Sequence, residues 1–146
     1  MNTEVYDLII VGAGPVGLFS AYYAGLRQMK VKVLESLSDC GGQLLQLYPE
    51  KTIKDIAGFP EVAAKDFIAQ LKKQLQSVSV TFEYNQEVLM VKKNESDIFE
   101  IKTKFATHLG KAVLLTTGGG AFTPRKLTIT HDDTLEGEKI FYQATD

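Results

Sequence analysis

The chain has 146 residues, of which 45% are hydrophobic and 23% are charged, and its formal net charge is −2. This composition is typical of one soluble globular domain with a core of its own, and it excludes a disordered chain. The near-neutral charge gives no electrostatic reason to expect nucleic acid, and no apolar run approaches the roughly 20 residues of a membrane-spanning helix.

The residues most often used in redox or acid–base chemistry are scarce. Cys40 is the single cysteine, so the sequence offers no internal disulfide, redox dithiol or cysteine-based zinc site. We expect Cys40 to be structural, and His108 and His131 to lie on the surface, because their surroundings are polar. Two acidic residues precede the first apolar run, whereas a signal peptide begins with basic residues. This difference favours a cytoplasmic location. We therefore predict neither a catalytic side chain nor a metal site.

The first half of the chain predicts a β-α-β unit followed by a long loop. Residues 5–11 end in a solid apolar run, which is typical of a strand buried on both faces. Apolar residues recur at helical spacing over 15–29, and residues 31–35 form a second short strand. The segment 36–60 is rich in Gly and Pro, and we expect a functional loop with at most a short helical turn.

The second half predicts one more helix and several strands. These elements are, in order, a helix over 65–76, a strand over 78–82, a hairpin of 88–91 and 98–103, an added antiparallel strand at 105–107 and a buried strand over 112–117. Hydrophobicity falls from residue 123 onward, so we expect a linker there.

The loop between the first strand and the first helix has the pattern GxGxxG. Its glycines, Gly12, Gly14 and Gly17, follow a strand and open a helix, which is the context that a dinucleotide-binding loop requires. They allow a tight turn, a close approach of pyrophosphate and close helix packing. The free N–H groups and the dipole at the helix start favour phosphate. Pro15 suits the first helical turn, where no N–H is needed.

An acidic residue at the end of the next strand strengthens this interpretation. Glu35 lies 18 residues after Gly17, close to the spacing of the acid that binds the adenosine ribose in such folds. A carboxylate there accepts hydrogen bonds from ribose hydroxyls and repels a 2′-phosphate, which disfavours NADP at this site. The loop and Glu35 therefore predict a bound dinucleotide, and both NAD and FAD satisfy the pattern.

The segment "CGGQLLQLYPEK" favours FAD over NAD. An NAD dehydrogenase would be expected to begin its next β-α unit soon after the acidic residue. This chain instead makes a glycine-bearing excursion with Gln43 and Tyr48, which suits the extended ribityl chain and flavin of FAD. The alternative is a surface loop with a turn at Gly41 and Gly42.

Several motifs in the same order resemble one flavoprotein family. They are "VGAGPVG", Glu35, "GGQL", "GFP" at 58–60 and "LLTTGGGAFTPRKL". The chain resembles the N-terminal part of the two-domain flavoproteins related to thioredoxin reductase, and "LYPEK" with "GAFTPRKL" is most similar to ferredoxin–NADP reductase type 2. The resemblance implies an α/β, Rossmann-like FAD-binding domain, a three-layer ββα sandwich. It has a central parallel sheet, an antiparallel β-meander over about 88–107, and helices on the other face.

The resemblance also implies which residues bind FAD. The cofactor-binding residues it gives are Gly12, Gly14, Pro15 and Gly17 at the pyrophosphate, Glu35 at the adenosine ribose, Gly42, Gln43 and Tyr48 toward the flavin, Val88 at the adenine through its backbone, Thr117 in the second FAD motif, and Phe122 near the isoalloxazine ring. Val88 and Phe122 also suit plain core packing, and Tyr48 also suits an ordinary loop anchor.

The domain organisation and reaction follow from the same resemblance. Residues 1–122 are expected to form the N-terminal portion of an FAD-binding domain, and residues 123–146 a crossover to an NADPH-binding domain absent from this sequence. The family is homodimeric and passes electrons from NADPH through FAD to ferredoxin or a similar acceptor. With a single glycine loop of this kind, the chain alone is not expected to complete that cycle. The alternatives are an NAD-dependent dehydrogenase domain and a non-catalytic nucleotide-binding fragment.

Overall fold

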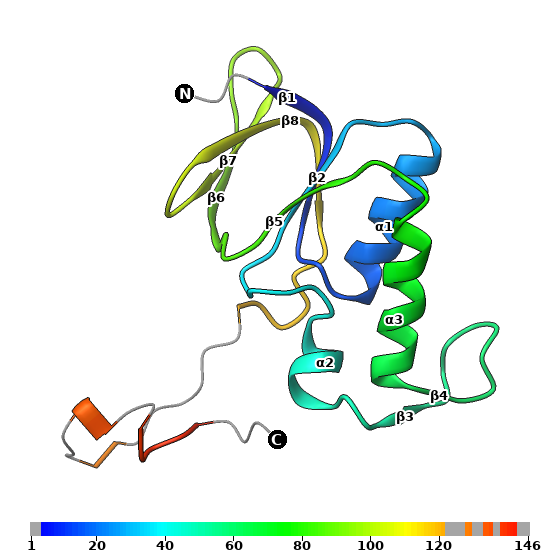
Figure 1. Ribbon diagram of the computed structural model, residues 1–146. Coiled ribbons are helices and arrows are strands. Elements are labelled where there is room, and N and C mark those ends of the chain that lie inside the picture. Colours follow the sequence, from blue (N-terminus) through cyan, green and yellow to red (C-terminus); the bar gives the residue numbers. More distant parts are fainter. Residues whose placement is uncertain (1–3, 122–127, 130–132, 136–137, 143–146) are drawn as a thin grey trace.

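The computed structural model describes residues 4–121, 128–129, 133–135 and 138–142 (Figure 1). The elements in chain order are β1 (Val5–Val11), α1 (Pro15–Leu26), β2 (Val31–Leu34), α2 (Gln43–Leu47), β3 (Thr52–Ile53), β4 (Val62–Ala63), α3 (Ala64–Leu75), β5 (Thr81–Glu83), β6 (Val88–Lys93), β7 (Phe99–Thr103), β8 (Thr107–Leu115) and a 3-10 turn at Asp133–Leu135. Within these described ranges, no helix is long and apolar enough to cross a membrane.

One six-stranded sheet in the order β5-β2-β1-β8-β7-β6 organises the fold. β1 pairs in parallel with β2 and β8, and β2 pairs in parallel with β5, whereas β6 and β7 are antiparallel. Figure 1 shows α1 and α3 side by side on one side of the parallel strands, with β6 and β7 on the other side. The predicted α/β fold with a parallel sheet and a β-meander is confirmed.

β8 is one long strand where two separate strands were predicted. The expected strands at 105–107 and 112–117 are replaced by β8, which pairs antiparallel with β7 along its first half and in parallel with β1 from Leu109 to Leu115. In the sequence, Gly110 in the middle of this segment suggests an interruption of the strand. In the structure, a Cβ at Gly110 would lie 3.0 Å from the side chain of Ile9, so the glycine allows close packing within a continuous strand.

The core has two layers because side chains alternate across β1. Ile10 packs on the helix side with Leu18 of α1 and Ile68 of α3. Ile9 packs on the meander side with Ile101 of β7. The two layers hold the parallel strands between the helices and the meander, as the predicted sandwich requires.

Two further differences from the predicted elements have local causes. The segment 36–60 contains the short helix α2 and the strand β3, which pairs antiparallel with β4. β5 begins at Thr81, later than predicted, because Val78 packs against α1. A Cβ at Gly25 would lie 2.7 Å from the Cβ of Val78, so this contact depends on the glycine.

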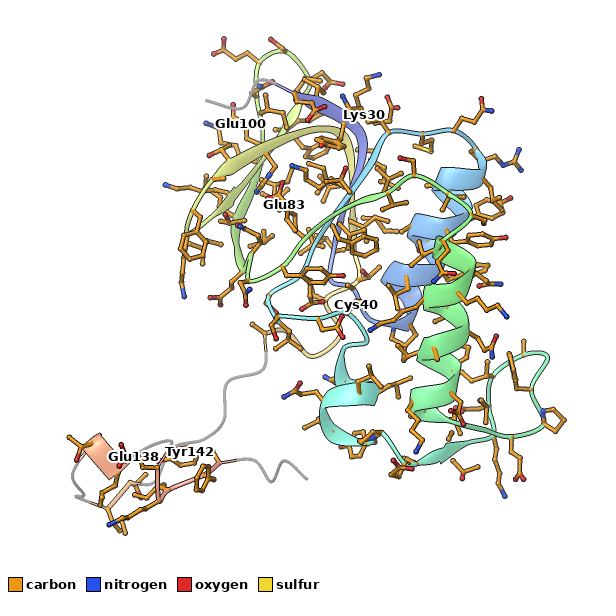
Figure 2. The ribbon with its side chains drawn as sticks, in the orientation of Figure 1. Lys30, Cys40, Glu83, Glu100, Glu138 and Tyr142 are labelled. Carbon is orange, nitrogen blue, oxygen red and sulfur yellow. The ribbon has the colours of Figure 1, made fainter. Side chains whose placement is uncertain are left out.

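A buried polar cluster lies between the parallel strands and the meander. The Lys32 ammonium on β2 pairs with the Glu83 carboxylate on β5 and lies 3.4 Å from Nδ1 of His108 on β8. Figure 2 shows Glu83 between these strands. The ring of Tyr6 packs 4.7 Å from the Lys32 ammonium.

The predicted surface position of His108 is wrong, because its side chain is only 5% exposed. Alternate residues of β8 face inward, so a polar neighbourhood in sequence does not place a strand residue at the surface. Burial lowers the pKa of His108, and Nε2 has no hydrogen-bond partner among the described residues. His131 lies outside the described residues.

Candidate nucleotide-binding site

A cavity of about 580 Å³ lies where the parallel strands end. In open α/β sheets, ligands bind at these carboxyl ends, and the volume falls within the roughly 300–1,000 Å³ of small-molecule sites. Segments from across the chain line the cavity, and its lining residues are Val11, Gly12, Gly14, Pro15, Val16, Leu34–Leu37, Gly42–Leu44, Gln46, Leu47, Gln86–Val88, Leu115–Gly118, Gly120 and Ala121.

The glycine loop is held tightly between β1 and β8. Gly12 has a φ of +102°, and a Cβ there would lie 2.6 Å from the carbonyl oxygen of Thr116. A Cβ at Gly17 would overlap the carbonyl oxygen of Gly12. The Thr116 hydroxyl donates to the carbonyl oxygens of Gly12 at 2.8 Å and Val11 at 3.0 Å. Gly12 therefore lines the cavity, whereas Gly17 lies behind it and allows the helix to approach.

The N-terminus of α1 opens on this cavity, and no side chain of the described residues caps it. Gly14 is the N-cap residue in an extended conformation, Pro15 begins the helix, and the first turn has neither a side-chain cap nor an acidic residue. Such a terminus leaves backbone N–H groups that suit an anion. A Cβ at Gly42 would lie only 3.0 Å from the Cα of Gly14, so a side chain at Gly42 would restrict the access of a ligand to the backbone at Gly14. These backbone surfaces fit a diphosphate.

Glu35 lies at the end of β2, and its carboxylate already holds the loop. The side chain is 5% exposed. Oε2 accepts a hydrogen bond from the backbone N–H of Ala13 at 2.6 Å. Oε1 accepts from the N–H of Leu37 at 2.9 Å and from the hydroxyl of Ser36 at 3.1 Å. A carboxylate has about four acceptor positions, so capacity for one ribose hydroxyl is left.

Gln43 and the run of glycines after β8 pack against each other on the side of the cavity near α2. A Cβ at Gly119 would lie 2.7 Å from Nε2 of Gln43, so a larger residue would displace the amide. Gly118 and Gly120 have positive φ values of 55° and 92°. Thr117 lines the cavity, and its carbonyl oxygen accepts from the N–H of Gly120 at 2.8 Å.

The structure brings most of the predicted site residues to one cavity. Those that line it are Gly12, Gly14, Pro15, Glu35, Gly42, Gln43, Val88 and Thr117. Tyr48 is not among the lining residues: it follows α2, is 48% exposed, and packs against the ammonium of Lys51 at 5.3 Å. Phe122 lies outside the described residues.

Some lining residues were missed by sequence reasoning. Thr116 stands next to the predicted Thr117, and only the fold shows that its hydroxyl holds the glycine loop. Leu37 and Gln86 line the cavity beyond the ends of β2 and β5. A search for residues just after each parallel strand would have found them, since those positions share one edge of the sheet.

Cys40 lies in the segment between β2 and α2 (Figure 2) and does not line the cavity. Its side chain is buried, and burial raises the pKa of the thiol. A thiol of this kind is a poor nucleophile, which supports a structural interpretation. Within the described part of the chain, no group of three His, Cys, Asp or Glu side chains is placed to hold a metal ion.

Comparisons with known proteins give the family. The model of the pyridine nucleotide-disulphide oxidoreductase family matches residues 6–145. The chain is 49% identical to ferredoxin–NADP reductase of Geobacillus thermodenitrificans and 46% identical to ferredoxin–NADP reductase 2 of Bacillus subtilis. Each match covers 99% of this chain and 44% of the relative. The chain therefore spans less than half the length of these relatives.

The fold also resembles solved structures. Thioredoxin reductase from Streptococcus pyogenes aligns with a TM-score of 0.68 at 23% identity, covering 86% of this chain and 38% of the other. This likeness supports the fold, and the family match rests on the sequence. The chain belongs to the pyridine nucleotide-disulphide oxidoreductase family, which confirms the resemblance drawn from its motifs.

Proposed function

We propose that this chain binds FAD in the cavity at the strand ends, as the FAD-binding part of an enzyme that passes electrons from NADPH to ferredoxin or a similar acceptor. The observation that carries the proposal is the shared cavity. The uncapped start of α1, the carboxylate of Glu35 and the segment around Thr117 all face it. When bound, the flavin supplies hydride acceptance and electron transfer, and the protein supplies binding and orientation.

Each part of the cavity suits one part of FAD. The backbone at Gly12 and Gly14, with Pro15, would hold the pyrophosphate at the start of α1, where Gly17 permits the close packing. Glu35 would accept from a hydroxyl of the adenosine ribose, and the backbone of Val88 would meet the adenine. The flavin half would lie toward Gly42, Gln43 and Thr117. Phe122 and Tyr48 are further contacts that only the family resemblance suggests, and Tyr48 lies outside the cavity lining.

The cavity's extent favours FAD over NAD. Beyond the pyrophosphate position it continues to Thr117, Gly118, Gly120 and Ala121. Gly42 and Gln43 of the loop 36–60 line the same part of the cavity. A compact dehydrogenase would be expected to begin its next β-α unit in place of this loop. The extended cavity therefore suits a ribityl chain and flavin.

The electron donor and acceptor rest on the relatives' names and on the family. Two relatives are called ferredoxin–NADP reductase, and this chain covers 44% of each. We propose that residues 1–122 form the FAD-binding unit and that 123–146 lead toward an NADPH-binding domain. The resemblance also favours a homodimer in the cytoplasm, and light scattering on the purified protein tests the assembly.

The experiment that tests the proposal is the visible spectrum of the purified chain, recorded before and after FAD is added and the sample is desalted. A flavin spectrum that survives desalting supports the FAD site. FMN, which has no adenosine half, should be lost in the same procedure. If FAD is not retained and calorimetry shows that NAD binds, the NAD-dependent dehydrogenase interpretation replaces this one. If neither binds, the proposed function is wrong.

A further inference from the structure

We propose that Gln86 is a specificity-determining residue of this cavity, and that its side-chain amide donates a hydrogen bond to the adenine ring. This inference rests on the proposed FAD site. Gln86 lies between β5 and β6, is half-buried, and lines the cavity beside Leu37 and Val88. Its place, its orientation and its free donor group each support the assignment.

The backbone ties Gln86 to the residue that would hold the ribose. The N–H of Gln86 donates to the carbonyl oxygen of Glu35 at 2.8 Å. The N–H of the preceding residue, Asn85, donates to the carbonyl oxygen of Leu37 at 3.0 Å, and Asn85 itself has a φ of 56°. Adenine is bonded directly to the ribose. A residue fixed beside Glu35 therefore lies next to the position that the base would occupy.

The side chain of Gln86 is oriented by a buried hydroxyl. Thr103 on β7 is 3% exposed, and its hydroxyl oxygen lies 2.7 Å from Oε1 of Gln86. That hydroxyl accepts hydrogen bonds from the N–H groups of Phe105 at 3.3 Å and Ala106 at 3.1 Å. With its acceptor positions used, the hydroxyl donates its proton, and the shorter of its two acceptor contacts is to the oxygen of Gln86.

This arrangement leaves the amide nitrogen of Gln86 as a donor. The described residues provide it with no hydrogen-bond acceptor. Adenine presents ring nitrogen acceptors, and in DNA recognition a glutamine amide donates to N7 of adenine as one half of a bidentate pair. Leu37 and Val88 beside it provide apolar contacts for the faces of a flat base. A side chain that can donate there would favour ligands that carry adenine over ligands that lack a base.

The test compares ligands with and without the base, using the whole chain. Dissociation constants for FAD, ADP and ribose 5-diphosphate are measured by calorimetry on the unaltered protein, Gln86→Leu and Gln86→Glu. The carboxylate of Gln86→Glu still accepts from Thr103 but has no proton to donate. Gln70→Leu, on the exposed face of α3, is the matched control. Circular dichroism and thermal unfolding check that each variant folds.

We expect both Gln86 variants to bind FAD and ADP about threefold to tenfold more weakly, as one hydrogen bond predicts. Ribose 5-diphosphate should bind the unaltered, Gln86→Leu and Gln70→Leu proteins equally, whereas the charge added in Gln86→Glu weakens the binding of every anionic ligand. Unchanged ADP affinity in a folded Gln86→Leu protein overturns the role of Gln86 and leaves the FAD site standing, as does an equal loss for ribose 5-diphosphate. If the unaltered protein binds neither FAD nor ADP, the proposed function fails, and this inference fails with it.

Discussion

At the scale of single residues, Glu35 has a structural role besides the ribose binding that the motif predicts. Its carboxylate fixes the backbone N–H groups of Ala13 and Leu37, so it shapes the glycine loop before any ligand binds. Removing it leaves these donors without their acceptor, which costs about 1–3 kcal/mol when the site is buried. The loop should therefore lose both its shape and its affinity for the cofactor.

We predict that Glu35→Ala lowers the free energy of unfolding by about 1–3 kcal/mol in the absence of FAD and weakens FAD binding by tenfold or more. Urea unfolding of the FAD-free protein measures the first effect, and calorimetry measures the second. Glu61→Ala is the control, because Glu61 is 67% exposed and pairs with Lys54 at 3.9 Å, a contact that contributes little. Unchanged stability in Glu35→Ala would contradict the structural task.

The residues of the site differ in how far sequence could predict them. Gly12, Gly14 and Glu35 are predictable because their roles depend on position relative to one strand, loop and helix. Gln86 is oriented by Thr103, 17 residues away along the chain, and this neighbour is known only once β6 and β7 pair. Contacts across the sheet carry no local periodicity, so they need the fold.

At the scale of elements, the cluster on β2, β5 and β8 places an ionisable imidazole between the parallel strands and the meander. His108 faces the Lys32 ammonium and the Glu83 carboxylate, with the ring of Tyr6 also in contact with Lys32. Burial lowers the pKa of His108 below its usual value of about 6.5. The folded protein therefore holds this imidazole neutral at pH values where the unfolded chain binds a proton.

We predict that stability falls as the pH decreases below about 6.5, because proton uptake by His108 in the unfolded chain favours unfolding. The stability that neutral His108 allows is fully present above that pH. Urea unfolding at a series of pH values from 7.5 to 5, at constant ionic strength, measures the effect. His108→Leu should flatten the profile over this range, and His131→Leu is the control. An equally steep profile in His108→Leu would assign the effect to other groups.

Elements were predictable wherever hydrophobic periodicity acts within one segment. β1 matches its predicted span, and α1 and α3 lie within a few residues of theirs. β8 was missed because Gly110 and its polar neighbours resemble a turn, although the glycine serves close packing on Ile9. The start of β5 was misplaced because Val78 packs on α1. In both cases a tertiary contact, invisible in one segment, decided the local structure.

At the scale of the whole molecule, the cavity joins segments that are distant along the chain. The loop after β1, the end of β2, α2, the start of β6 and the end of β8 all line it. The two core layers fix the sheet, and several of these segments lie beyond its strands. A ligand that touches all of them binds only when all are in place, so its binding free energy adds to the stability of the fold.

We predict that FAD at 100 times its dissociation constant raises the free energy of unfolding by about 2.7 kcal/mol, as mass action requires for a ligand that binds only the folded chain. Thermal unfolding across an FAD concentration series measures the effect, and FMN at the same concentrations is the control for the flavin half without the adenosine half. Glu35→Ala should need higher FAD concentrations for the same shift, in proportion to its weaker binding. A midpoint that does not move with FAD, while the chain is folded, would show that the cavity does not hold the cofactor.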